Sequence, residues 1–256
     1  MNNTTGGDSA SARLHFQTRF LRRDAMVLVL TWAASGVDAI SYLGLGHVFT
    51  ANMTGNAVLL GLAVGQGQGL AALRSIIALA GFVVGVAIGA MIVERSPNQG
   101  EWPRAATRAV VLECIVLGLF TITWHLPRAA QSGESLYELI ALSALAMGIQ
   151  SAAIRHLKVP GIATTYITGT LTSMVAGFVG SFHSGRVSES ARVTSSAERK
   201  HGARLQAAVL VIYVLAAVAS AFLQARRSKL VTFSPLVAVA LVVVNGLFRH
   251  RYESLT

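Results

Sequence analysis

Hydrophobic residues along the chain form eight runs separated by short polar connections. An apolar helix of roughly 20 residues crosses a hydrocarbon core of about 30 Å. The pattern therefore predicts an all-α, polytopic membrane protein in which most of the runs are transmembrane helices. The runs cover residues 25–43, 50–64, 73–93, 105–125, 136–154, 161–181, 205–224 and 232–248.

Two of the runs carry polar residues and glycine where contact with lipid would exclude them. Run 161–181 follows a Pro-Gly pair and is rich in threonine. Backbone groups that a broken helix leaves unpaired are costly in hydrocarbon, so such segments face protein or water. Both runs are predicted to be broken or re-entrant, which leaves six transmembrane helices. The other broken run, 50–64, is short and contains Asn52, Thr54, Gly55 and Asn56.

The two broken segments also resemble each other. Residues 52–56 read NMTGN and residues 166–170 read YITGT, and upstream GVD at 36–38 stands at the place of GIQ at 148–150. Short matches arise by chance in apolar, glycine-rich sequence, but these two occur in the same order in each half. With six spans they predict an inverted-topology repeat, whose paired broken segments are typical of a transporter's binding site. Eight spans would make the repeats parallel instead.

The positions of the 21 Lys and Arg residues indicate the orientation, because cytoplasmic loops carry the excess. With a cytoplasmic N-terminus, a six-span arrangement places more of these residues inside than an eight-span arrangement does. Arg226, Arg227 and Lys229 fall outside in both. The predicted organisation is a cytoplasmic tail (1–24), one transmembrane domain (25–248) with halves 25–125 and 136–248 and a flexible loop at 183–204, and a cytoplasmic tail (249–256).

Composition narrows the class further. Charged residues make up 12% of the chain, compared with about 25% in soluble domains. The net charge of +10 is scattered at the ends of the runs, which argues against a nucleic-acid partner. Cys114 is the single cysteine, so an intramolecular disulfide is excluded. The sequence carries no metal or cofactor motif, and the absence of HExxH and GxSxG predicts that the protein is not an enzyme.

Asp38 lies about 14 residues into the first run, near or beyond the mid-depth of the bilayer. A lone carboxylate there is costly, so it is expected to be protonated, paired or hydrated. One interpretation is a proton or cation coupling site. The other is a structural carboxylate that accepts backbone N–H bonds or caps the broken helix. Gln150 at the matching place in the second half is neutral, so charge-coupled chemistry would be asymmetric.

Hydroxyl, amide and freed backbone groups of the two broken segments complete the candidate site. Exposed helix N-termini attract anions, whereas freed carbonyls suit cations. The alternative role of these side chains is to form hydrogen bonds between packed helices. The predicted solute- or ion-binding residues are Asp38, Asn52, Thr54, Gly55, Asn56, Gln150, Thr168, Gly169 and Thr170.

Two further titratable residues are candidates for a proton relay. Glu113 lies about nine residues into the fourth run, and Arg108 is close enough along the helix to reach toward it. A salt bridge or a position near the head groups is the alternative role of Glu113. Histidine exchanges protons near neutral pH, so His47 is the second candidate, with an interfacial hydrogen-bonding role as its alternative.

Residues 81–89 read GFVVGVAIG, which places Gly81, Gly85 and Gly89 on one face of a helix. Such a stripe of small residues lets two helix backbones approach closely. It predicts tight helix packing, either within the chain or between copies in a homo-oligomer.

Two motifs resemble those of a known family. Residues 35–43, SGVDAISYL, and 49–56, FTANMTGN, are similar to the signature of the YoaK-like bacterial membrane proteins, a family of unknown function. Residues 166–170 are similar to its second motif, and the resemblance covers roughly residues 22–248. It implies a multi-pass protein of the bacterial inner membrane, without indicating a substrate or a catalytic residue.

Together these observations favour a secondary transporter or permease for a small polar or anionic solute, with Asp38 as the candidate for proton coupling. The alternative is a non-transporting membrane protein that scaffolds, senses or assists a partner. The expected partners are the lipid bilayer and a small solute or ion.

Overall fold

The computed structural model describes residues 22–95, 100–126, 133–157 and 189–253, together with 169, 171–172, 175–176 and 179. The regular structure in these residues is helical, without a β-strand. Six helices are long and apolar enough to cross a membrane, which confirms the polytopic all-α class. They are α2 (Arg23–Gly44), α4 (Gly69–Glu94), α5 (Arg104–His125), α6 (Gly133–His156), α8 (Glu189–Arg227) and α9 (Phe233–Glu253), and a shorter helix, α3 (Met53–Gly65), lies between the first two.

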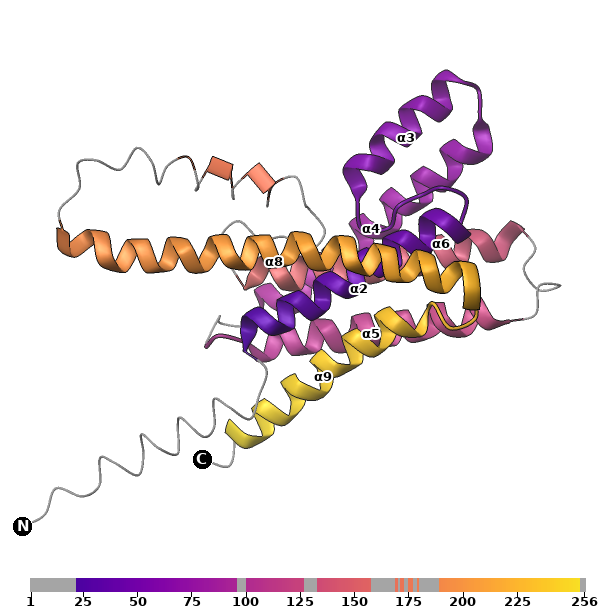
Figure 1. The fold of residues 1–256 in the computed structure, drawn as a ribbon. Coiled ribbons are helices and arrows are strands. Elements are labelled where there is room, and N and C mark those ends of the chain that lie inside the picture. Colours follow the sequence, from indigo (N-terminus) through magenta and orange to yellow (C-terminus); the bar gives the residue numbers. More distant parts are fainter. Residues whose placement is uncertain are drawn as a thin grey trace, which may run out of the picture.

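The bundle is built around α2 and α6, which are the most buried of the six long helices. Helix α6 packs against α4 and α5, helix α2 packs against α8 and α9, and α5 packs against α9 (Figure 1). The peripheral helices α4, α8 and α9 keep large apolar side chains exposed along much of their length. In a bilayer these side chains contact lipid, so the surface hydrophobicity that would be a liability in water is expected here.

The glycine stripe of α4 packs against α6 of the same chain. A Cβ at Gly85 would collide with the Leu145 carbonyl, and a Cβ at Gly148 of α6 would collide with backbone atoms of α4. Gly81 and Gly89 face α6 in the same way. Because α6 occupies this face, the structure gives no support to a homo-oligomer formed through Gly81, Gly85 and Gly89, and the stripe serves intramolecular packing.

Helices α2 and α8 form a second close contact. A Cβ at Gly36 would lie 3.2 Å from Ser220 Oγ, so small residues again face each other at the crossing. The two helices run parallel, since Asp24 at the start of α2 meets His201 at the start of the apolar part of α8, and Gly44 at the end of α2 meets Gln224 near the end of α8. Helices α4 and α6 are parallel as well, because successive glycines of α4 face successively later residues of α6.

Contacts at the end of α2 show that α4 runs back toward the opposite end of the bundle. Gly46, two residues beyond α2, lies against Arg74 in the second turn of α4. Gly44 packs against Trp124 at the end of α5, whose neighbour His125 contacts Phe233 at the start of α9. The chain between α2 and α4, including α3, therefore leaves and returns at one end of the bundle (Figure 1).

The glycine contact between α4 and α6 gives the first prediction. Gly85→Ala and Gly148→Ala each place a methyl group against backbone atoms and should destabilise the protein by about 1–3 kcal/mol. Gly61→Ala is the matched control, because a Cβ there meets nothing within 4 Å and alanine is the better helix former. Chemical unfolding in detergent measures the difference. Equal stability of Gly85→Ala and Gly61→Ala would contradict the packing described.

Candidate functional site

The chain after α2 turns back and contacts α2 before α3 begins. Residues 45–52 are non-helical, and the backbone N–H groups of Thr50 and Ala51 donate to Asp38 Oδ1 at 2.8 and 2.7 Å. The N–H of Asn52 lies 3.4 Å from the same oxygen. Asp38 lies six residues before the end of α2, which is about 9 Å along the helix axis. The non-helical segment therefore re-enters the bundle beside α2.

The second carboxylate oxygen of Asp38 joins this segment to α8. The hydroxyl of Tyr213 donates to Asp38 Oδ2 at 2.9 Å, and Ser35 Oγ donates to the Tyr213 carbonyl at 2.5 Å. Asp38 is buried, and both of its oxygens accept hydrogen bonds. The geometry matches the second interpretation of Asp38 given above, in which the carboxylate has a structural role and accepts backbone N–H bonds at the start of a broken helix. It holds α2, the re-entrant segment and α8 together.

Helix α3 begins where these bonds are made. Asn52 is its N-cap, and its side chain accepts a hydrogen bond from the Gly55 N–H at 3.2 Å. The N-terminal end of a helix carries partial positive charge, which a nearby carboxylate stabilises. Helix α3 thus starts beside Asp38 and runs to a turn at Gln66 and Gly67, where φ at the glycine is +68°.

The break in the helix lies before Asn52 and not at Gly55 as the sequence suggested. Gly55 is in the first turn of α3, and a Cβ there would lie 2.9 Å from a ring carbon of Phe49. Phe49 in turn stacks on Tyr42, with 5.1 Å between the ring centroids. Glycine is therefore required because the re-entrant segment crosses directly over the start of the helix.

Asn56 fixes the same segment from the other side. Its Oδ1 accepts from the Phe49 N–H at 2.9 Å, and its amide nitrogen donates to the Phe49 carbonyl. Ser41 and Thr50 share a further hydrogen bond of 3.0 Å between their hydroxyl oxygens. The amide of Asn56 thereby gives the non-helical backbone the partners that lipid does not provide.

The predicted binding residues divide into three groups. Asp38, Asn52, Gly55 and Asn56 come together in the arrangement above, whereas Thr54 is exposed on the surface of α3. Gln150 is buried on α6 and donates to the Leu30 carbonyl of α2 at 3.0 Å. The third group is the second broken segment: Gly169 is helical and half-buried, and Thr168 and Thr170 lie outside the described residues.

The two proton-relay candidates occupy different settings. Glu113 on α5 is completely buried, and neither carboxyl oxygen has a hydrogen-bond partner among the described residues. Arg108 is exposed and forms no ion pair with it in that part of the chain. His47 is exposed in the re-entrant segment, with φ +64° and its ring edge-on to Tyr42 at 5.1 Å. No hydrogen bond within the described ranges joins either residue to Asp38.

Sequence reasoning missed Tyr213, the side chain that connects α8 to Asp38. It is the only tyrosine in the apolar run 205–224, and a phenol within hydrocarbon needs a hydrogen-bond partner, so a search for partners of Asp38 would have found it. Among the described residues no three His, Cys, Asp or Glu side chains gather as metal ligands.

Comparison with known proteins agrees with this architecture. Residues 26–246 match the family model described as Protein of unknown function (DUF1275). A curated relative, the UPF0700 transmembrane protein YoaK of Bacillus subtilis (strain 168), is 40% identical over 159 residues, which cover 62% of this chain and 68% of the relative. No solved structure matches the chain. Six apolar helices and the extent of the family match together show that the chain is a multi-pass membrane protein of the YoaK-like DUF1275 family.

Proposed function

We propose that the protein is a secondary transporter or permease for a small polar or anionic solute. The observation that carries the proposal is that a non-helical segment, and with it the start of α3, is bonded to a buried carboxylate of a membrane-spanning helix. In transporters, interrupted helices of this kind place helix ends and freed backbone groups near the middle of the membrane, where solutes and coupling ions bind. We locate the solute site next to the start of α3.

The packing of the long helices supports an inverted repeat that relates α2–α5 to α6–α9. A two-fold axis in the plane of the membrane would exchange α2 with α6 and α4 with α8. The contact between α4 and α6 would then correspond to the contact between α8 and α2, and in both contacts the helices are parallel and close. It would also exchange Gly148 with Gly36, and these glycines lie at the two crossings. Helices α5 and α9, which would exchange with each other, are antiparallel, since Thr107 near the start of α5 bonds to His250 near the end of α9.

Asp38 acts in this proposal as a built-in anion at the start of α3. Its carboxylate occupies the N–H groups of Thr50 and Ala51 that an anionic solute would otherwise bind. Protonation would remove the charge that attracts these donors and the positive helix end. Proton coupling through Asp38 would therefore work by releasing the re-entrant segment.

Glu113 is the stronger candidate for carrying a proton through the bundle. It has no hydrogen-bond partner in the described part of the protein, so a gain or loss of its proton breaks no bond that holds the helices together.

A second function, that of a non-transporting scaffold, sensor or accessory protein, is favoured by one observation. Both carboxylate oxygens of Asp38 and both polar atoms of the Asn56 amide have partners in the chain, so the polar groups of this cluster are satisfied without a solute. The two functions differ in whether the cluster opens, which labelling and flux measurements can test.

The topology gives the second prediction. In a chain with Cys114→Ala, Gln66→Cys should react with an impermeant maleimide from the periplasmic side and Arg104→Cys from the cytoplasmic side. Both positions are exposed, and six spans place them on opposite sides with cytoplasmic termini. The reverse pattern would contradict six spans with cytoplasmic termini and would leave either eight spans or six spans of the opposite orientation.

The third prediction concerns the hold of Asp38 on the re-entrant segment. Asp38→Asn removes the charge that accepts the backbone bonds, each worth about 1.5–3 kcal/mol, so Ala51→Cys should become roughly tenfold or more reactive toward impermeant thiol reagents. Ala51 is buried in the intact protein. Glu113→Gln is the control, because it neutralises an acid that makes no contact with this segment. Unchanged labelling in the Asp38 variant would show that the carboxylate does not hold the loop.

The fourth prediction is proton-coupled flux. Currents on solid-supported membranes should appear for one class within a panel of carboxylates, phosphate, amino acids and neutral polyols. Glu113→Gln should abolish accumulation driven by a pH gradient while leaving solute exchange intact, because exchange needs no net proton movement. If no class gives a current and a protein partner co-purifies instead, the scaffold function replaces the transporter.

A further inference from the structure

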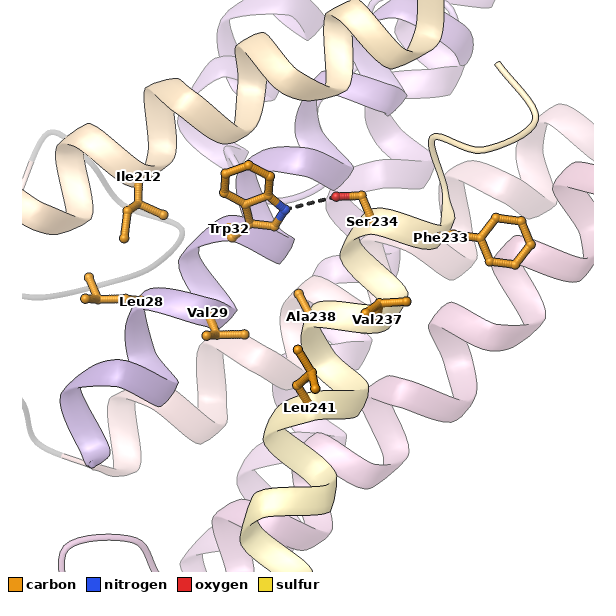
Figure 2. Close-up of a pocket in the computed structure, with 9 residues that line it drawn as sticks. All are labelled: Leu28, Val29, Trp32, Ile212, Phe233, Ser234, Val237, Ala238 and Leu241. Carbon is orange, nitrogen blue, oxygen red and sulfur yellow. Dashed lines mark hydrogen bonds between the residues drawn. The ribbon is translucent and has the colours of Figure 1, made fainter. Parts of the chain in front are cut away.

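An apolar groove of about 590 Å³ lies between α2, α8 and α9 (Figure 2). Leu28 and Val29 of α2 form one side, Ile212 of α8 another, and Val237 and Leu241 of α9 a third. The part of α9 that lines it, from Phe233 to Leu241, rises about 12 Å along the helix axis. The groove is therefore elongated along membrane-spanning helices.

The polar atoms in the wall of the groove bond to each other. Trp32 Nε1 donates to Ser234 Oγ at 3.0 Å, as Figure 2 shows. The remaining lining side chains are hydrocarbon or aromatic. A polar solute would have to leave its water without gaining partners, which is costly, so the occupant that fits is a hydrocarbon chain.

A cluster of positive charge adjoins one end of this groove. Arg226 and Arg227 end α8, and Lys229 lies in the connection from α8 to α9; all three are exposed, and this basic connection leads directly into Phe233 of the groove. His125 fixes the connection in place, since its ring nitrogen lies 2.6 Å from the Lys229 carbonyl and its ring centroid 5.2 Å from that of Phe233. The basic residues are thereby held beside the groove.

These basic residues form no ion pair in the part of the chain that the structure describes. Residues 205–248 contain no Asp or Glu. In both topologies considered above, these three residues lie on the outer side of the membrane, where an excess of Lys and Arg is not expected. Basic side chains at the membrane surface between helices are suited to the phosphate of a lipid head group.

We propose that the groove and the basic connection together bind an anionic phospholipid. One acyl chain lies along α2, α8 and α9, and Arg226, Arg227 and Lys229 contact the phosphate. The apolar lining selects a lipid over a soluble anion, and the charge selects an anionic head group over a zwitterionic one. This site is independent of the proposed transport function.

Fluorescence of Trp32 tests the proposal, because its indole lines the groove. The full chain with Trp102→Phe and Trp124→Phe keeps Trp32 as its only tryptophan. In phosphatidylcholine vesicles, brominated phosphatidylglycerol should quench it at several-fold lower mole fraction than brominated phosphatidylcholine, up to roughly fivefold for each basic residue in contact. The combined variant Arg226→Gln, Arg227→Gln and Lys229→Gln should remove the preference.

The matched control replaces three exposed arginines that flank the connection from α4 to α5, at the other end of the bundle. The combined variant Arg95→Gln, Arg104→Gln and Arg108→Gln should keep the preference for phosphatidylglycerol. Ala238→Phe, which fills the groove, should weaken quenching by both lipids. Equal quenching by the two lipids in the unmodified groove, or quenching by neither, would overturn the proposal. The chain with all its tryptophans gives a second readout, since phosphatidylglycerol in detergent should raise its unfolding temperature more than phosphatidylcholine does.

Discussion

The arrangement depends on how the protein satisfies backbone N–H groups inside hydrocarbon. A non-helical segment in the membrane exposes donors that lipid cannot pair, and an isolated carboxylate there is equally unfavourable. Asp38 and residues 50–52 remove both costs at once, because the carboxylate accepts the bonds that the backbone must make. Helix α3 can begin beside Asp38 only because of this pairing.

Close packing of small residues then positions the helices that carry the pairing. Gly36 allows α8 to approach α2, which brings Tyr213 within hydrogen-bond distance of Asp38. Gly85 and Gly148 allow the corresponding approach of α4 and α6. The two crossings differ in chemistry: Asp38, two residues after Gly36, bonds to Tyr213 of α8, whereas Gln150, two residues after Gly148, is neutral and bonds to Leu30 of α2. An energetic asymmetry is thus built into an otherwise similar pair of contacts.

Sequence patterns were sufficient for the class of fold and for the existence of a broken segment. Hydropathy reports the energy of burying a helix in lipid, and this energy dominates the structure of a membrane protein, so the six long helices were predictable. The exact break was not, because Gly55 looks like a helix breaker in sequence while its actual role is to leave space for Phe49. Likewise, no pattern in α4 alone distinguishes α6 from a second copy of the chain as the partner of its glycine stripe. Those details depend on contacts between residues far apart in the chain.

The two buried acids show why geometry must decide between structural and functional roles. Both lie in apolar runs, and sequence alone treats them alike. Asp38 accepts bonds from three backbone groups and a phenol, so moving it requires breaking several charge-assisted hydrogen bonds together. Glu113 has no such bonds in the described residues. A change of protonation at Glu113 would therefore break no existing bond there, whereas at Asp38 it would weaken the bonds that hold residues 50–52 and Tyr213. In the proposed transport function, Asp38 is accordingly assigned to the conformation of the re-entrant segment and Glu113 to the transfer of the proton.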